Sequence, residues 1–150
     1  MQILSHYLMN VQSWSLQEIL LFSNNADMFN QEQQLFFFKL LLKSLPHYQS
    51  YDRAVPVYAS LLANLLPTLF RKQEWADISQ ALGWLEEMSK EFTSSFFRIV
   101  FLYYSGLFAI CQGDTIAGEK KVLWALNTLQ ILDQANIAAE LEAFFMTLKR

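Results

Sequence analysis

Few residues in this sequence could take part in catalysis. The two histidines, His6 and His47, have no cysteine or carboxylate at the spacing of a metal site. Two serines and an aspartate stand near His47, but loops between helices collect such residues because they form turns. The chain has no glycine-rich phosphate loop and no paired zinc-binding cysteines. We therefore expect no enzyme activity, no catalytic residue, no metal site and no cofactor.

Two further candidates for chemistry have simpler structural explanations. The adjacent Glu86 and Glu87 are typical of a solvated helix face rather than of an acid–base pair. Cys111 is the only cysteine and ends an apolar run, which predicts a packed thiol rather than a reactive one. A single cysteine also excludes an internal disulfide and fits a reducing compartment.

Asn64 is the polar residue that most needs an explanation, because it interrupts the leucine-rich run LLANLL. A carboxamide can accept from a peptide N–H and donate to a peptide C=O, which suggests that Asn64 anchors an extended peptide. The alternative is an Asn bonded to a neighbouring helix end or to the carbonyl that Pro67 leaves unpaired. Tyr103 and Tyr104 offer further aromatic faces and hydroxyls, with core packing as the alternative. Asn24 is a weaker candidate, because helix capping also explains it.

The composition limits the fold and the partners. The chain has 150 residues, of which 53% are hydrophobic and 17% charged, and its net charge is −3. This length predicts one domain over residues 1–150. Binding to nucleic acid by this chain is not expected, because phosphate contacts require clustered Lys and Arg and no such cluster exists. The first ten residues lack the basic segment and apolar run of a secretion signal.

The hydrophobic periodicity predicts an all-α fold of about eight helices joined by short loops. Asn24 is expected to cap one helix in the left-handed conformation, and Asn30 with Gln33 predicts a capping box. Pro46 is expected to end a helix, and Asn136 to cap the last one. The expected helices cover residues 2–11, 14–24, 30–45, 52–72, 74–88, 99–111, 115–130 and 137–148.

The stretch from Phe96 to Gln130 resembles a tetratricopeptide repeat, a helical hairpin that stacks into solenoids. Its first helix, Ile99–Cys111, is apolar on all sides, which predicts burial. Its thirteen residues rise roughly 20 Å, too short for the roughly 30 Å of a bilayer core. In the turn Gln112-Gly113-Asp114, the glycine is suited to end one helix and the aspartate to cap the next.

Small residues mark where the helices of this hairpin should approach closely. Gly106 occupies such a position on the first helix, and Gly118 and Ala125 occupy such positions on the second. The second helix should bury a stripe that contains Val122, Leu123, Leu126 and Leu129. The preceding helix matches the central one at an offset of about 40 residues, longer than the usual 34 or so. This offset places Asn64 opposite Tyr104 and Leu66 opposite Gly106.

Two further predictions concern Pro67 and the last helix. Pro67 lies inside its helix and should bend the axis, because it removes a hydrogen bond and clashes with the carbonyl of Ala63. The last helix carries an unusually apolar stripe for a terminal repeat, which predicts a homodimer across a two-fold axis. The residues of this predicted dimer surface are Leu141, Phe144, Phe145 and Leu148.

With these features in order, the sequence resembles the C-terminal domain of the Rgg/GadR/MutR transcriptional regulators. The resemblance rests on Tyr7-Leu8 and Trp14, on EILLF at residues 18–22 with Asn24, on Asn64 in its leucine-rich helix, on VFLYYSG with Cys111-Gln112-Gly113, and on Trp124-Ala125-Leu126. It implies a cytoplasmic, dimeric, TPR-like regulatory domain. In that family a short quorum-sensing peptide binds the concave face, and an Asn of the kind found at position 64 grips the peptide backbone.

The sequence departs from this family in one respect. Family members carry an N-terminal helix-turn-helix domain, and nothing before Met1 supplies one. DNA binding is therefore expected only of a parent protein, not of this chain, and no membrane interaction is expected. Two functions remain open: a peptide-sensing, dimerising domain of an Rgg-like regulator, or a ligand-free TPR-like scaffold that joins protein partners.

Overall fold

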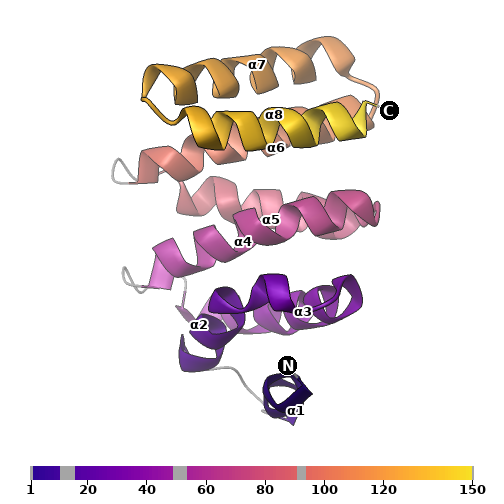
Figure 1. Ribbon diagram of the computed structural model, residues 1–150, viewed down its shortest axis with the longest axis vertical. Helices are drawn as coiled ribbons and strands as arrows, with labels where there is room; N and C mark the ends of the chain where they lie inside the picture. The colour runs from indigo at the N-terminus through magenta and orange to yellow at the C-terminus, as the bar shows by residue number, and fades with distance from the viewer. Residues whose placement is uncertain (1, 11–15, 49–53, 91–93, 150) are drawn as a thin grey trace. The chain divides into compact units, whose positions relative to one another are not determined.

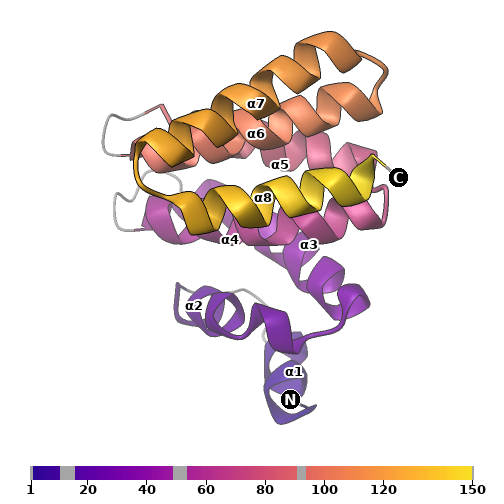
Figure 2. The same cartoon turned by 45° about the horizontal axis from the view of Figure 1, so that its top comes forward.

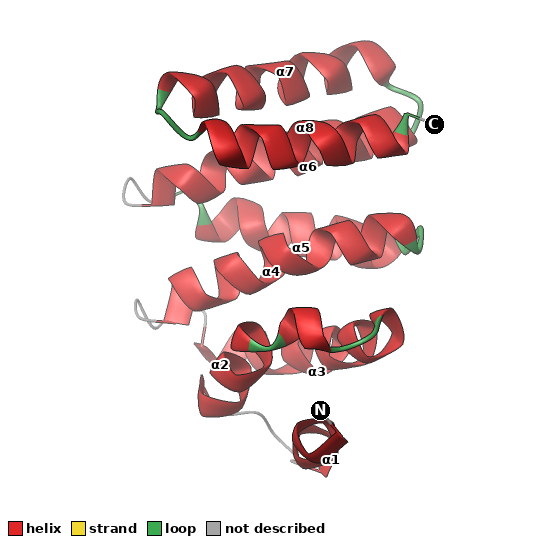
Figure 3. Ribbon diagram, viewed as in Figure 1, coloured by secondary structure: helices red, strands yellow, loops and turns green. Residues whose placement is uncertain are grey.

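The computed structural model describes residues 2–10, 16–48, 54–90 and 94–149, and within these ranges helices joined by short loops are the regular structure, without a β-strand (Figure 1, Figure 3). This confirms the predicted all-α class of eight helices. The helices are α1 (Gln2–Asn10), α2 (Leu16–Asn24), α3 (Gln31–Tyr48), α4 (Ala54–Arg71), α5 (Trp75–Met88), α6 (Ser95–Cys111), α7 (Thr115–Ile131) and α8 (Ala135–Leu148), with a short 3-10 helix, η1 (Ala26–Met28). None of the described helices is long and apolar enough to cross a bilayer.

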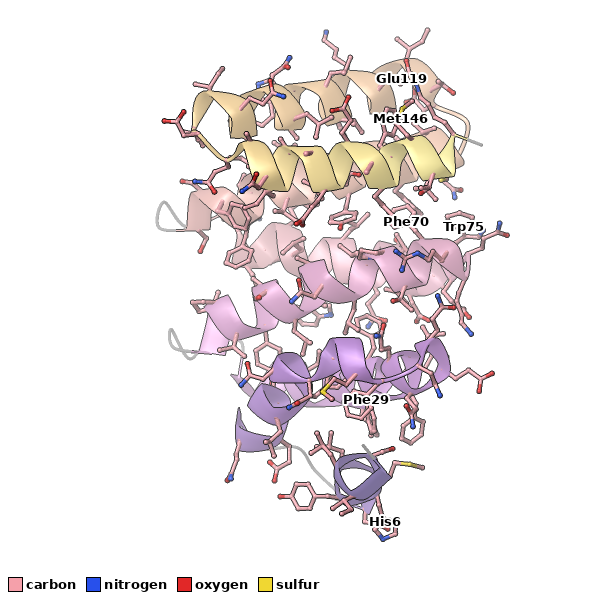
Figure 4. All side chains as sticks on the ribbon, in the orientation of Figure 1. His6, Phe29, Phe70, Trp75, Glu119 and Met146 are labelled. Carbon is pink, nitrogen blue, oxygen red and sulfur yellow. The ribbon has the colours of Figure 1, made fainter. Side chains whose placement is uncertain are left out.

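The chain divides into two compact units, Met1–Trp75 and Ala76–Arg150. The first unit is built on an aromatic cluster in which Phe22, Phe29 and Phe37 contact one another, with ring centroids 5.1 to 5.7 Å apart. All three side chains are buried, and Figure 4 labels Phe29 among them. Such tilted and edge-to-face pairs stabilise a core beyond the area that they bury.

A partly buried polar network joins three elements of the first unit. The hydroxyl of Thr68 on α4 donates to Oε1 of Gln34 on α3 at 2.7 Å. Nε2 of Gln34 donates in turn to the carbonyls of Ala26 at 2.7 Å and Phe29 at 3.2 Å. Because these carbonyls belong to η1 and the residue that follows it, the single amide of Gln34 holds the turn after α2 against α3 and α4.

The helix ends of the first unit agree only in part with the predictions. The capping box is confirmed, because the backbone N–H of Asn30 donates to Gln33 Oε1 at 3.1 Å and that of Gln33 donates to Asn30 Oδ1 at 2.8 Å. The prediction of a left-handed cap at Asn24 was wrong. Helix α2 does end there, but Asn25 has φ −125° and its side-chain amide donates to the Leu21 carbonyl at 2.8 Å. A side-chain bond thus satisfies the carbonyl that a left-handed turn would otherwise cover.

Pro46 does not end its helix, contrary to the prediction, since α3 continues to Tyr48. A proline removes only the hydrogen bond to the fourth preceding carbonyl, and here the helix ends two residues later, so one bond near the terminus is lost. The predicted start of the next helix at Asp52 lies outside the described residues. Pro67 does lie inside α4, and the bend that it should cause stays a prediction.

The second unit centres on the hairpin of α6 and α7, which run side by side (Figure 1, Figure 2). Gly106 and Gly118 approach each other closely, and Ala125 of α7 is also buried. This confirms the predicted small residues. The hydroxyl of Tyr103 on α6 donates to the Leu141 carbonyl at 2.5 Å and so links α6 to α8.

Three helices end in the same tight turn. After α4, α6 and α7, the residues Gln73, Gly113 and Asp133 have φ values of 56°, 100° and 59°. The residue after each donates its N–H to a carbonyl five positions earlier, as Asp114 does to Ala109 at 2.9 Å. This is the Schellman arrangement, in which a left-handed residue lets the last carbonyls be satisfied. Positions 73 and 113 are 40 apart, which agrees with the predicted offset of the internal repeat.

Other details of the second unit correct the sequence-based expectations. Leu123 is exposed, whereas Val122, Leu126 and Leu129 are buried as expected. Cys111 is exposed, because it is the last residue of α6 and lies beyond the part of the helix that packs. Burial of α6 is concentrated in the middle of the helix, because Phe96 near its start is exposed and Phe108, Ala109 and Ile110 near its end are half-buried.

The predicted caps of the last two helices were also only partly correct. Asp114 occupies the N-cap position of α7, but its side chain makes no capping hydrogen bond. Helix α8 begins at Ala135 with Gln134 as N-cap, so Asn136 is a helical residue rather than a cap. The reason is the preceding turn: the N–H of Gln134 donates to the Leu129 carbonyl at 2.8 Å, and the new helix starts directly after it.

Candidate functional site

Helix α4 buries most of its circumference and leaves one narrow strip accessible. Tyr58, Leu61, Leu62, Leu65 and Leu66 are all 2% exposed or less. Apart from the half-buried Val55 and Val57 in the first turn, the accessible residues recur at helical spacing along one face, and we call them the α4 strip. They are Pro56, Ser60, Ala63, Asn64, Pro67 and Arg71, of which Pro56, Asn64 and Arg71 are exposed and the others half-buried.

Asn64 lies near the middle of the α4 strip with its side chain exposed. Within the described part of the chain, its amide has no hydrogen-bond partner. The structure therefore does not show the alternative in which this amide is used up by a neighbouring helix end. One acceptor and two donors remain available to a ligand at this position.

Pro67 adds a second polar group beside Asn64. Because proline has no N–H, the carbonyl of Ala63 cannot receive its usual bond within the helix. Ala63 and Pro67 are both half-buried members of the α4 strip, so this carbonyl is an acceptor next to the Asn64 amide. Arg71, one turn beyond Pro67, places a guanidinium near the end of the same strip.

Tyr103 and Tyr104 are core residues, and their rings cannot offer the faces that were considered for a ligand. They are 0% and 3% exposed, and their rings form an edge-to-face pair with centroids 4.9 Å apart. Burial raises the pKa of Tyr103, whose hydroxyl remains bonded to the backbone of α8. The core-packing alternative is therefore the one that the structure shows.

Asn24 is exposed at the end of α2 and belongs to the same unit as Asn64. The Gln34 network brings the turn that follows Asn24 close to Thr68, one helical turn beyond Asn64. This relationship places the two asparagines on neighbouring elements. It does not place their side chains on a common face, so Asn24 remains a secondary candidate.

The described residues offer little else for chemistry. Among them, no three His, Cys, Asp or Glu side chains lie together in a way that could hold a metal ion. His6 points outward from α1 (Figure 4), and the side chain of His47 lies outside the described residues. Although Cys111 is exposed, the part of its surroundings that excludes water raises the pKa of its thiol.

The sequence matches a known protein family over most of its length. Residues 1–143 match the family described as HTH-type transcriptional regulator Rgg, C-terminal domain. The chain belongs to the Rgg C-terminal domain family. The family is one of transcriptional regulators, and among curated proteins no sequence matches this Rgg domain.

Solved structures support the assignment of the fold. A putative transcriptional regulator from Listeria monocytogenes EGD-e is 30% identical, with a TM-score of 0.77 over 99% of this chain and 52% of that one. The Streptococcus dysgalactiae SHP pheromone receptor Rgg2 is 19% identical, with a TM-score of 0.78 over 97% and 54%. The Regulator of Proteinase B, RopB, complexed with SIP, is 23% identical, with a TM-score of 0.56 over 97% and 64%. The chain thus spans about half the length of the first two.

The residues predicted for dimerisation lie on α8 but differ in accessibility. Leu141, Phe144 and Leu148 of the Rgg domain are half-buried. Phe145 is 6% exposed, and the Lys149 ammonium lies 4.6 Å from the centroid of its ring. Phe145 is therefore a core residue, and the accessible part of the predicted dimer surface is formed by the other three.

The outer face of α7 exposes apolar side chains that sequence reasoning did not single out as a surface. Ile116, Leu123, Trp124 and Ile131 are each more than half exposed. Their signal in the sequence is weak, because α7 is apolar on both its inner and its outer side. Glu119 and Met146 lie near the same end of the α7–α8 pair (Figure 4), where Glu119 bonds Lys149 at 3.3 Å.

Proposed function

We propose that this chain is the peptide-sensing regulatory domain of an Rgg transcriptional regulator and that Asn64 grips the main chain of a short signalling peptide. The observation that carries the proposal is the exposed amide of Asn64 in the middle of the α4 strip. Around this point the leucine-rich helix buries its other sides and keeps one carboxamide accessible. A carboxamide can pair with any peptide backbone regardless of its side chains.

The α4 strip has the length that a short peptide needs. From Pro56 to Arg71 the helix rises about 22 Å, at 1.5 Å per residue. An extended peptide rises about 3.3 Å per residue, so about seven residues would cover this length. Its backbone would meet Asn64 and the Ala63 carbonyl near the centre, and Arg71 would lie nearest to any acidic group at one end.

The relatives of the family support a peptide as the ligand class. Rgg2 is described as a pheromone receptor, and RopB was crystallised with SIP. By analogy, the parent regulator of this domain would bind DNA through a separate part of the protein and act in the cytoplasm, where the peptide would change its activity. We further propose that the domain forms a homodimer through the accessible residues of α8, namely Leu141, Phe144 and Leu148.

Calorimetric titration of the chain with a panel of synthetic peptides of about seven residues tests the proposal. Saturable binding by some peptides of the panel, competed by one another, is the expected result. The rival function is a scaffold that binds only folded proteins. It predicts no heat with any peptide of the panel, together with retention of a folded partner.

A further inference from the structure

A pocket lies in the second unit, and no residue of the α4 strip lines it. It has a volume of about 510 Å³ and is formed where the end of α5, the beginning of α6 and the last turns of α7 meet. This volume lies within the range of sites for small molecules. Its lining combines the charged Lys90 and Arg98 with the apolar Ile99, Trp124 and Leu132 and with hydroxyl groups.

Arg98 carries a buried hydrogen-bond donor that a ligand could satisfy. Its Nη1 is buried, and among the described residues it has no hydrogen-bond partner. One face of the guanidinium lies over the ring of Phe101, with Cζ 5.0 Å from the ring centroid. That contact orients the charged group but supplies no acceptor for its N–H donors. A buried donor without an acceptor is costly, so an acceptor from outside would stabilise this arrangement.

The charge balance of the pocket favours a single negative group. Lys90 bonds Glu87 at 2.8 Å, and both side chains are exposed. The hydrogen bond and the charge of Glu87 raise the pKa of Lys90, while the charge of Arg98 lowers it. Because Glu87 already compensates Lys90, the one uncompensated positive charge of the described lining is that of Arg98.

The apolar part of the lining indicates what the negative group is attached to. Trp124 and Leu132 are 52% and 54% exposed, and Ile99 is buried beside Arg98. A ligand with an apolar side would cover these two exposed side chains. A carboxylate matches a guanidinium in a planar two-point contact, whereas a phosphate dianion would require a second free cation.

We infer that this pocket binds a carboxylate that carries an apolar group, with Arg98 pairing the carboxylate and Trp124 and Leu132 covering the apolar part. Such a group occurs in two sources, a free apolar carboxylic acid and the C-terminal residue of a peptide that ends in an apolar side chain. The site is independent of the function proposed for Asn64, because it uses no residue of the α4 strip.

The test is a ligand titration of the 150-residue chain. Binding is monitored through the NMR signal of the Arg98 side chain. The probe is N-acetyl-leucine, with N-acetyl-leucinamide as the uncharged match. We expect the acid to bind with a Kd of about 1 mM or tighter, to shift the Arg98 signal, and to bind at least about tenfold more tightly than the amide. Equal binding of acid and amide would overturn the inference, and so would inorganic phosphate that binds as tightly as the acid.

Three variants locate the binding. Arg98→Gln should weaken N-acetyl-leucine at least about tenfold, and Lys90→Gln by no more than about twofold. The melting temperature of each variant shows whether the fold is retained, and equal affinities of Arg98→Gln and the unmodified chain would contradict the inference. Glu91 lies outside the described residues, and Glu91→Gln is included to test whether its carboxylate pairs with Arg98. Binding of N-acetyl-leucine to this variant alone would show that Arg98 is paired within the chain, and it would overturn the inference.

A final comparison separates the two sources. A heptapeptide that ends in leucine is titrated as its free acid and as its C-terminal amide, into the chain and into its Arg98→Gln variant. A C-terminal residue is the ligand class if the free acid binds in an Arg98-dependent way, and a free carboxylic acid is the class if only N-acetyl-leucine does. Asn64→Ala should leave both results unchanged, so this site and the proposed peptide site can fail separately.

Discussion

Gly106 and Gly118 face each other across the α6–α7 hairpin so closely that neither position has room for a Cβ atom. A Cβ on Gly106 would lie 2.7 Å from the carbonyl oxygen of Gly118, and one on Gly118 would lie 2.5 Å from the carbonyl oxygen of Gly106. Both carbonyl oxygens are backbone atoms, which cannot move away by a rotamer change as the end of a flexible side chain can. These two glycines therefore determine how near the helices of the hairpin approach.

We expect Gly106→Ala and Gly118→Ala each to lower the free energy of unfolding by about 1–3 kcal/mol, because the hairpin must open to admit a methyl group. Gly83 is the matched control. It is exposed inside α5, and a methyl group added there would have no atom within 4 Å, so Gly83→Ala should stabilise by about 0.5–1 kcal/mol. Urea unfolding measures all three. A change of the same sign at positions 83 and 106 would contradict this account.

The left-handed turns give a second prediction about stability. Gln73 and Asp133 have φ near 60°, a conformation that is unfavourable for residues with a Cβ. Replacing either by glycine should raise the free energy of unfolding by up to about 1 kcal/mol. Gly113→Ala, at the equivalent turn with φ 100°, should lower it by about 1 kcal/mol. Thermal unfolding of the three variants measures these changes. The change in stability at position 113 must have the opposite sign to the changes at positions 73 and 133.

Pro67 should bend α4 by more than about 20°, which a crystal structure of the chain would measure. Pro67→Ala restores the bond to the Ala63 carbonyl, so it should stabilise the fold by roughly 1–3 kcal/mol and straighten the helix. It should also weaken any peptide that uses this carbonyl. Pro56 lies in the first turn of α4, where no hydrogen bond is lost, so Pro56→Ala is the control and should have little effect. Equal effects of the two replacements would show that Pro67 carries no special cost.

The proposed dimer is tested by the oligomeric state at micromolar concentration. An interface through α8 should bury more than about 1,500 Å² in total, enough for a stable dimer. Phe144→Glu should convert it to a monomer, because it places a charge among Leu141 and Leu148. Phe145→Glu is unsuitable, since that ring is buried and the variant would unfold. Leu123→Glu on the exposed face of α7 is the control. Sedimentation equilibrium measures the oligomeric state of both variants. If Leu123→Glu dissociates the dimer and Phe144→Glu does not, the interface lies on α7 instead.

Much of the fold was predictable because its signals are local. The spacing of apolar residues identified eight helices, and the resemblance of residues 96–130 to a tetratricopeptide repeat identified Gly106, Gly118 and Ala125 as contact positions. The 40-residue offset between the turns at Gln73 and Gly113 also followed from the sequence. These features depend on residues within one hairpin, where the periodicity of the sequence and the packing agree.

The features that were missed depend on tertiary context. The side chain of Gln73 does not indicate a left-handed residue, and Asp133 tolerates this conformation without requiring it, so the turn geometry imposes it. Tyr103 stood as a further candidate beside Asn64, with core packing as the alternative, because a sequence does not tell which polar group is bonded to a neighbouring helix. The pocket around Arg98 is formed by three segments up to 43 positions apart in the chain, so no local pattern could indicate it.

The central claim is that the exposed amide of Asn64 binds the backbone of a signalling peptide. The most direct measurement is the affinity of a peptide from the panel for the unmodified chain, for Asn64→Ala and for Asn127→Ala. Asn127 is an exposed carboxamide on α7, so it controls for the chemistry of the replacement. We predict a loss of about 1–3 kcal/mol at position 64, because peptide groups become desolvated and unpaired, and no change at position 127. Equal affinities of the unmodified chain and Asn64→Ala would contradict the claim.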